Sequence, residues 1–266
     1  MTDAIPRPDG VLEVEVEARA GRALGTGVPV LDRVLGRLRS GEVTLIDSGS
    51  DFLFTLQSLL CVRNVLEHGS EVVFLDGGNS VDPHAMVDIG KRFGLRRGDI
   101  LPMVNVARAF TCYQMASLVL DVAREKVEDV GAGLLILSCF PTLYLDEDVP
   151  AVEAHQLFLQ SMHRVREIAE REDLVTLVTN AGPTKLQRRK GIRRVLYEGA
   201  DSRLRFQQLR DSVVITHLDD YRREVYTPVA AGQTTLEDFE GEARLAFPLD
   251  FAPREVKETE HLFLGW

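Results

Sequence analysis

The sequence predicts an α/β fold in which helices flank a mostly parallel central sheet and antiparallel strands follow towards the C-terminal end. Two features predict this class. Short, continuous apolar runs alternate with longer segments whose apolar residues recur every three or four positions, as in buried parallel strands joined by helices. Beyond residue 180, shorter strand-like segments are separated by polar turns, which is the pattern of antiparallel hairpins.

The parallel strands are expected at short apolar runs, namely Val43–Asp47, Glu71–Leu75, Met103–Val106, Gly133–Leu137 and Leu174–Val178. Helices are expected where apolar residues have helical spacing, namely within Gly25–Gly36 and at Asp51–His68, Asp82–Gly90, Gln114–Val130 and Val149–Glu172. Pro83 suits the first turn of its helix. The antiparallel strands are expected at Ser202–Leu209, Ser212–Leu218 and Arg222–Thr227.

Both ends of the chain differ from this core. Val11–Glu17 alternates valine with glutamate, which predicts a half-exposed edge strand that either completes its own sheet or adds to a neighbouring one. The end of the chain is charged and finishes in HLFLGW, a docking peptide or a segment that folds back on the core. We therefore divide the chain into an N-terminal edge strand and lead-in (1–24), a core domain (25–240) and a C-terminal tail (241–266).

Composition restricts the classes of function. The chain has 266 residues and a formal charge of −10, so it should repel polyanions unless its positive charge is gathered in one place. The widely spaced Cys61, Cys112 and Cys139 suit a reducing cytoplasm and argue against disulfides or a zinc site. No run approaches the ~18 apolar residues of a membrane span. We expect a cytoplasmic protein without a metal or a membrane partner, in which the acidic run Asp146–Asp148 caps the following helix.

The segment after the first parallel strand has the frame of a phosphate-binding loop without its chemistry. Gly41–Leu56 reads GEVTLIDSGSDFLFTL, where a P-loop would carry G-x-x-x-x-G-K-[ST]. Phe54 holds the lysine position, and Leu53 replaces the glycine before it. A P-loop wraps phosphates with backbone N–H groups and reaches the β/γ oxygens with its lysine, so we expect no nucleotide cofactor here.

The order of these segments resembles the ATPase core of the RecA/RadA recombinase superfamily, most closely the archaeal RadA type and its shorter paralogues. The resemblance covers roughly Gly25–Asp238. Its most specific part is VARAF at Val106–Phe110, followed by Gln114 and Met115. The entry segment GVPVLDRVLG and the pair Thr179–Asn180 also resemble family motifs, although Ala181 stands where the family has a glutamine thought to sense the γ-phosphate.

The departures from the family pattern fall on its nucleotide site, which here consists of Ser48, Phe54, Thr55, Gly78 and Ser138. Thr55 keeps the magnesium-binding hydroxyl, but Gly78 replaces the glutamate that would activate water and Ser138 replaces the magnesium-associated aspartate. Asp82 and Ala85 replace two arginines. The resemblance therefore implies a non-catalytic relative. Phe52–Phe54 either fills the vacated phosphate cavity or forms an exposed apolar patch for a partner.

A basic segment follows the last parallel strand. KLQRRKGIRR supplies six positive charges without an acid, from Lys185, Arg188, Arg189, Lys190, Arg193 and Arg194. It falls where recombinases carry the second of two DNA-facing loops, and Gly191 would give such a loop backbone freedom. Its role is to contact nucleic-acid phosphates, to dock an acidic partner, or only to pair with acids of this chain. Because it contains no aromatic residue, DNA binding is expected to be non-specific.

These expectations favour a non-catalytic RadA-like paralogue that acts as an accessory or regulatory protein in DNA recombination and repair. It would bind single- or double-stranded DNA through the basic segment, and a RadA-like recombinase or another repair protein through a recombinase-like face. The alternative is a protein-interaction module without DNA binding, which forms a homodimer or joins an active homologue. An enzyme with a rebuilt nucleotide site is a third interpretation, and an ATP-gated filament is not expected.

Overall fold

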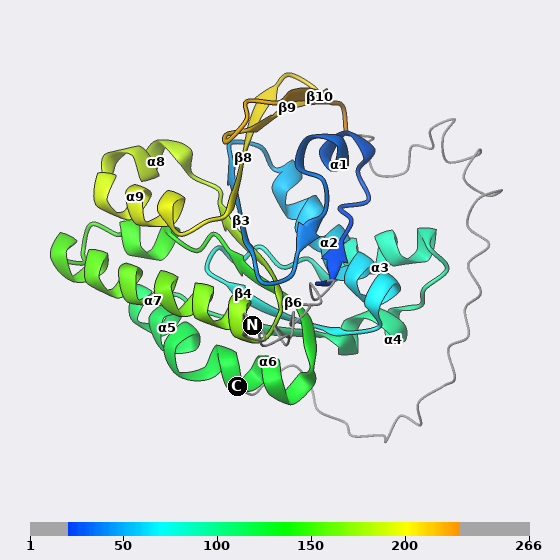
Figure 1. Ribbon diagram of the computed structural model, residues 1–266, viewed down its shortest axis with the longest axis horizontal. Coiled ribbons are helices and arrows are strands. Elements are labelled where there is room, and N and C mark those ends of the chain that lie inside the picture. Colours follow the sequence, from blue (N-terminus) through cyan, green and yellow to red (C-terminus); the bar gives the residue numbers. More distant parts are fainter. Residues whose placement is uncertain (1–20, 229–266) are drawn as a thin grey trace, which may run out of the picture.

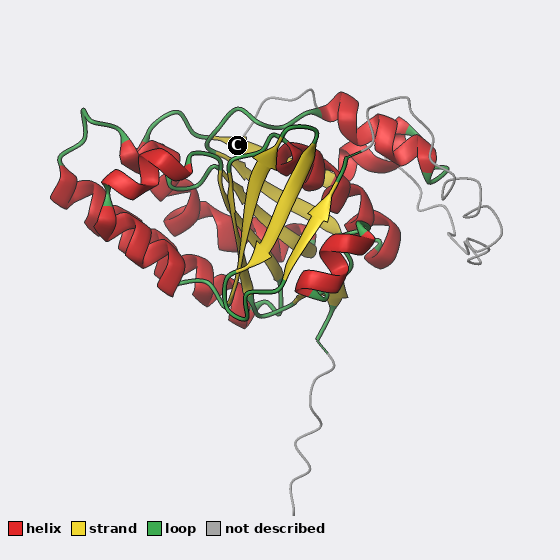
Figure 2. Ribbon diagram, turned by 90° about the horizontal axis from the view of Figure 1, so that it is seen from above, coloured by secondary structure: helices red, strands yellow, loops and turns green. Residues whose placement is uncertain are grey.

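A central sheet lies between two layers of helices in the computed structural model, which describes residues 21–228 (Figures 1 and 2). The described part of the sheet has eight strands in the order β10-β9-β8-β3-β7-β6-β4-β5. The strands are β3 (Val43–Ser48), β4 (Glu71–Asp76), β5 (Val104–Arg108), β6 (Ala132–Ser138), β7 (Val175–Asn180), β8 (Ser202–Leu209), β9 (Ser212–His217) and β10 (Arg223–Tyr226). A small antiparallel pair, β1 (Ala23–Leu24) and β2 (Leu38–Arg39), lies apart from this sheet.

Each layer of helices covers one face of the sheet. One layer consists of α1 (Pro29–Leu35), α2 (Phe52–His68), α3 (Pro83–Arg92), α4 (Arg97–Ile100) and the 3₁₀ turn η1 (Leu101–Met103). The other consists of α5 (Cys112–Ser117), the π-helical turn η2 (Leu118–Val122), α6 (Ala123–Val130), the 3₁₀ turn η3 (Thr142–Leu145), α7 (Ala151–Arg171), α8 (Pro183–Arg188) and α9 (Lys190–Glu198).

The strands read as continuous apolar runs because both faces of the sheet are buried. In β4, Val73 and Leu75 belong to the core on the α7 side, whereas Val72 and Phe74 belong to the core on the α2 side. This alternation follows from the two-residue period of a strand. The predicted fold class is confirmed, since β3 to β8 are mutually parallel and β9 and β10 continue the sheet antiparallel. β8, which was expected among the antiparallel strands, is antiparallel to β9 but runs parallel to β3.

Individual elements differ from expectation in detail. The helix expected at Gln114–Val130 is present, but it begins at Cys112 and contains the π-helical turn η2. The acidic run does not cap α7, because the helix begins at Ala151 behind Pro150 and the Asp146 carboxylate instead accepts a hydrogen bond from the Asp148 backbone (3.1 Å). The predicted strand Val11–Glu17 and the tail 241–266 lie outside the described residues.

Three further findings concern the cysteines, the length of apolar helices and the clustering of possible metal ligands. Cys61, Cys112 and Cys139 are buried free thiols. Between residues 21 and 228, no helix combines the length and the apolar character that a bilayer crossing requires. Within the same range, no group of three or more histidine, cysteine, aspartate or glutamate side chains is placed to hold a metal ion.

Candidate functional site

Two residues of the altered nucleotide site, Ser48 and Ser138, lie at the ends of strands at one edge of the sheet. Because β3, β4, β6 and β7 are parallel, their carboxyl ends lie side by side. Ser48, Asp76, Ser138 and Asn180 are the last residues of these four strands. In open α/β sheets, this edge is where ligands bind.

The backbone N–H groups of the loop between β3 and α2 donate to acceptors of the protein itself. Gly49 N–H donates to the Phe206 carbonyl (2.9 Å) and Ser50 N–H to the Ser48 hydroxyl (3.0 Å). Farther along, Phe52 N–H donates to Ser50 Oγ (3.3 Å) and Leu53 N–H to the Ser50 carbonyl (3.3 Å). The α2 helix already begins at Phe52, so only Gly49–Asp51 remain between strand and helix. These N–H groups point to protein acceptors and are not free to wrap a phosphate.

The apolar residues at the start of α2 turn inward. Leu53 is fully buried, and Phe52 lies against Phe206 and Tyr226 with ring centroids 5.8 and 5.0 Å away. Phe54, at the lysine position, is half-buried against the same core. Of the two interpretations of these residues, inward packing is confirmed, and Thr55 is left exposed.

A compact hydrogen-bond network occupies the edge at β4, β6 and β7. Gln57 of α2 donates to the hydroxyls of Ser138 and Thr179, both at 2.9 Å, and the Ser80 and Ser138 hydroxyls lie 2.7 Å apart. The fully buried Asp76 accepts from the Ser80 hydroxyl (2.9 Å) and from backbone N–H groups of the loop after β4. Gln57 and Ser80 were missed in the sequence. A glutamine on the buried face of an apolar helix was the available signal.

Gly78 holds the position of the activating glutamate. The residue is exposed, but Cys139 occupies the space where its side chain would begin. A Cβ atom placed on Gly78 would lie 2.5 Å from Cys139 Sγ and 2.8 Å from Cys139 Cβ. Cys139 follows Ser138 directly and has a left-handed backbone (φ 50°) that turns the chain towards this loop. Burial raises the pKa of the Cys139 thiol, so it remains a neutral packing group. Positions 78 and 139 therefore fit each other, and no side chain fits at residue 78 without a shift.

The basic segment is helical, which corrects the expected loop. Lys185 and Arg188 lie on α8, and Lys190, Arg193 and Arg194 lie on α9. These five side chains are exposed and form what we call the basic face. Leu186, Ile192 and Leu196 are buried beneath it, in the core that also contains Phe158 of α7. Gly191 supplies no loop freedom, because it lies within α9 where a Cβ would come within 2.9 Å of the His155 ring.

The predicted cations differ in their partners. Arg189 is half-buried and donates to the Asp146 carbonyl (3.1 Å), which leaves it turned away from the basic face. Arg194 forms an ion pair with Glu198 one turn farther along α9 (2.8 Å). The Arg193 guanidinium lies over the Tyr197 ring, 5.1 Å from its centroid, which is a cation–π arrangement.

Beneath α9, the buried Asp47 of β3 gathers three partners, a set we call the Asp47 cluster. Asn180 donates to it at 2.7 Å and the Tyr197 hydroxyl at 2.5 Å, and Arg205 of β8 lies 3.5 Å away. Burial and the neighbouring Asp47 carboxylate raise the pKa of Tyr197, so its hydroxyl stays protonated and donates. The altered nucleotide site is thus directly adjacent to the basic face.

A second exposed feature belongs to the VARAF segment. Phe110, its last residue, is 72% exposed, and Tyr113 nearby in α5 is 48% exposed. Aromatic side chains are enriched at protein interfaces, although single exposed aromatic residues are common on protein surfaces and Tyr221 is exposed as well.

The chain is similar in sequence to a known protein family and to several curated proteins. The family model for Rad51 matches residues 24–189. The chain is 25% identical over 189 residues to "Meiotic recombination protein DMC1 homolog A" of Oryza sativa subsp. indica, which covers 67% of this chain and 52% of the relative. It is 26% identical over 168 residues to "DNA repair protein RAD51 homolog A" of Zea mays (58% and 48% covered).

A human relative, "Meiotic recombination protein DMC1/LIM15 homolog", is 28% identical over 170 residues, with 60% of this chain and 47% of the relative covered. The chain thus spans about half the length of the curated relatives it matches. The match to the family model includes the altered nucleotide site, the VARAF segment and α8, and it covers more than half of the chain. The chain belongs to the Rad51 family, within the RecA/RadA recombinase superfamily that its motifs resemble.

Proposed function

We propose that this protein is a non-catalytic accessory or regulatory member of the Rad51 family that acts in DNA recombination or repair and binds nucleic acid non-specifically. The relatives named above are described as meiotic recombination and DNA repair proteins, which supports the biological setting. A RadA-like recombinase or another repair protein is the proposed protein partner.

The basic face carries the proposal. Five exposed cations on two short, adjacent helices stand out on a chain of net charge −10. Such a local concentration attracts a polyanion that the rest of the surface repels. Phosphate contacts give affinity without sequence information, so the proposed binding is non-specific.

The non-catalytic part of the proposal is supported by the contacts at the sheet edge. Phosphoryl transfer depends on positioning and on charge stabilisation by a lysine and magnesium. Here the loop N–H groups have protein acceptors, Phe54 is half-buried against the core, and Ser138 is held in a hydrogen-bond network of Gln57 and Ser80. Cys139 occupies the space that a side chain at residue 78 would need, so a carboxylate that activates water does not fit there without a shift.

Fluorescence anisotropy with labelled single- and double-stranded DNA of several sequences tests this function. We expect binding that differs little between sequences and weakens steeply with salt. An Arg188/Arg193/Arg194 alanine variant should bind weakly, with a log–log salt slope smaller by up to about 2 to 3, since each phosphate contact contributes about 0.7 to 0.9. Equal binding by wild type and variant would remove the basic face from the proposal.

The second candidate is a protein-interaction module without DNA binding, and the exposed Phe110 and Tyr113 favour it. An aromatic patch of this kind would contact a second copy of the chain or an active homologue. The same titration separates the two candidates, because wild-type protein that does not bind DNA at low salt would leave the interaction module as the better account.

A further inference from the structure

Two kinds of contact hold α9 against the sheet. Its apolar side is buried through Ile192 and Leu196, which holds the helix close to the core. Hydrophobic contacts are non-directional, so they restrain rotation of the helix about its axis only weakly. Its polar attachment is the Asp47 cluster, in which the Tyr197 hydroxyl donates to Asp47 (2.5 Å) and accepts from Arg205 (2.8 Å). Hydrogen bonds to a buried charge are directional and among the stronger ones in proteins.

The same cluster reaches the beginning of α8. Asn180 donates to Asp47 through its amide nitrogen (2.7 Å) and accepts from Gly182 N–H, the residue just before α8, at 3.4 Å. From β8, Arg203 also donates to the Tyr197 carbonyl (3.3 Å). Strands β3, β7 and β8 are therefore linked to both helices of the basic face by contacts that this chain supplies itself.

Tyr197 is the point where the cluster meets the basic face. Its hydroxyl end is bonded to Asp47, and its ring carries the Arg193 guanidinium. A guanidinium on an aromatic face loses fewer orientations when it binds a phosphate than one free in water. The position of the ring then determines where Arg193 is presented.

We infer that Tyr197 is a positioning residue for nucleic-acid binding: its hydroxyl, bonded to buried Asp47, fixes α9 so that the ring presents Arg193 to a phosphate. The inference rests on the proposed function and adds to it that the basic face is set in place by side chains of this chain. Binding is then expected to proceed without a further ligand to order α8 and α9.

Tyr197→Phe tests the inference, because it removes the hydroxyl and keeps the ring beneath Arg193. The control is Tyr144→Phe, which removes the hydroxyl of a buried tyrosine that is hydrogen-bonded to Ser161 of α7 (3.1 Å) and takes no part in the Asp47 cluster. We expect Tyr197→Phe to weaken DNA binding by about threefold. This is less than the roughly tenfold or more that one hydrogen bond to a charged group is worth, because the bond orders α9 and does not itself contact DNA. Tyr144→Phe should bind like wild type.

A double-mutant cycle with Arg193→Ala separates positioning from a general loss of structure. If Tyr197 acts through Arg193, Tyr197→Phe should have little further effect on DNA affinity in the Arg193→Ala background. Additive losses would overturn the inference while leaving DNA binding itself in place.

Amide hydrogen exchange of residues 190–198 provides a readout that needs no DNA. Exchange should be faster in Tyr197→Phe than in wild type or Tyr144→Phe, because the hydrogen bond from the Tyr197 hydroxyl to Asp47 is lost and only the bond from Arg203 to the residue 197 carbonyl remains. Unchanged exchange together with unchanged DNA affinity would contradict the role of Tyr197. Absence of DNA binding by the wild-type protein would instead refute the proposed function, which this readout distinguishes.

Discussion

Cys139 restricts what residue 78 can be. Its Sγ and Cβ occupy the space that a Cβ on Gly78 would need, at 2.5 and 2.8 Å. Because a Cβ atom cannot approach so closely, the loop or Cys139 would have to shift before any side chain could enter. Introducing a glutamate at residue 78 alone is therefore expected to disturb the edge of the sheet without creating a catalytic base.

We predict that Gly78→Ala destabilises the fold by about 1 kcal/mol, the lower end of the cost of overpacking, because the new Cβ meets Cys139 but Gly78 itself lies in an exposed loop. Gly98→Ala is the matched control, because a Cβ at Gly98 in α4 meets no atom within 4 Å. It should be neutral or slightly stabilising, since alanine favours helix over glycine. Urea unfolding measures both variants.

A rescue completes this test. Adding Cys139→Gly to Gly78→Ala should recover part of the lost stability, because it removes both clashing atoms and suits the left-handed backbone of residue 139. A Gly78→Ala variant as stable as wild type would show that the loop adapts freely.

In the sequence, the altered nucleotide site could be recognised only by the functional residues that its motifs lack. Phe54, Gly78 and Ser138 stand out because the surrounding motifs define what belongs there. What fills the space could not be read in the same way. Gln57, Ser80 and Cys139 lie at other points of the chain and meet only when β4, β6 and α2 are assembled.

Helix α9 lies in the basic segment, where a loop was expected. The family resemblance predicts a DNA-facing loop at residues 185–194, although Ile192 and Leu196 have the spacing of one helix turn. In the structure, that apolar pair is buried and the cations occupy the opposite side. The number of cations available to a ligand then depends on their pairing along the helix.

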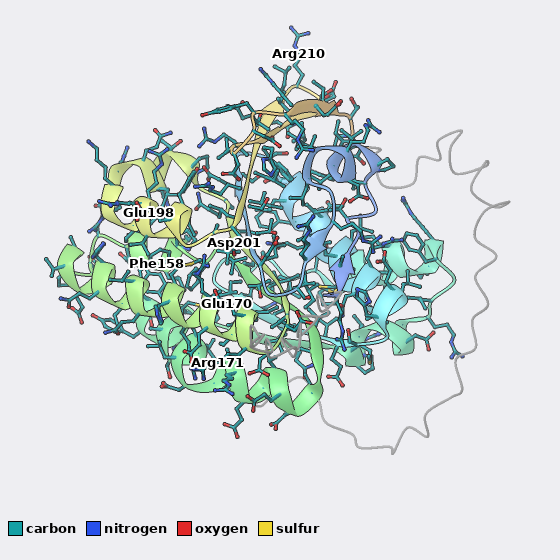
Figure 3. The ribbon with its side chains drawn as sticks, in the orientation of Figure 1. Phe158, Glu170, Arg171, Glu198, Asp201 and Arg210 are labelled. Atoms are coloured by element: carbon teal, nitrogen blue, oxygen red, sulfur yellow. The ribbon has the colours of Figure 1, made fainter. Side chains whose placement is uncertain are left out.

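Glu198 reduces the charge of α9, since it pairs with Arg194 at 2.8 Å. Glu198→Gln should strengthen DNA binding and increase the salt slope by up to about one ion, because Arg194 becomes free for a phosphate. Glu170→Gln is the control: it changes the net charge equally and breaks the pair of Glu170 with Arg166 on α7 (3.3 Å), while Arg166 keeps its pair with Asp201 (3.2 Å). Figure 3 labels both glutamates, on α9 and α7 respectively.

Anisotropy titrations of the two variants at low salt decide between a local and a global effect of charge. The account predicts a clear gain for Glu198→Gln and little change for Glu170→Gln. Equal gains would mean that net charge, and not the basic face, controls association.

At the scale of the molecule, the fold class was predictable because burial on both faces leaves a strong trace, as in the continuous apolar run of β6. Strand order was not predictable in the same way. β3 lies between β7 and β8, both far from it in the sequence, and this arrangement depends on how the crossover helices pack. The adjacency of the altered nucleotide site and the basic face follows from that order.

At the scale of the molecule, DNA binding is expected to be independent of nucleotide. If side-chain contacts of this chain close the edge of the sheet and set the basic face in place, nucleotide should have no influence on DNA binding. The most direct measurement is the affinity of the wild-type protein for labelled single-stranded DNA with and without millimolar Mg²⁺ and ATP, compared with an equal ionic strength of salt. The account predicts the same affinity in both conditions, and a specific change caused by ATP would contradict it.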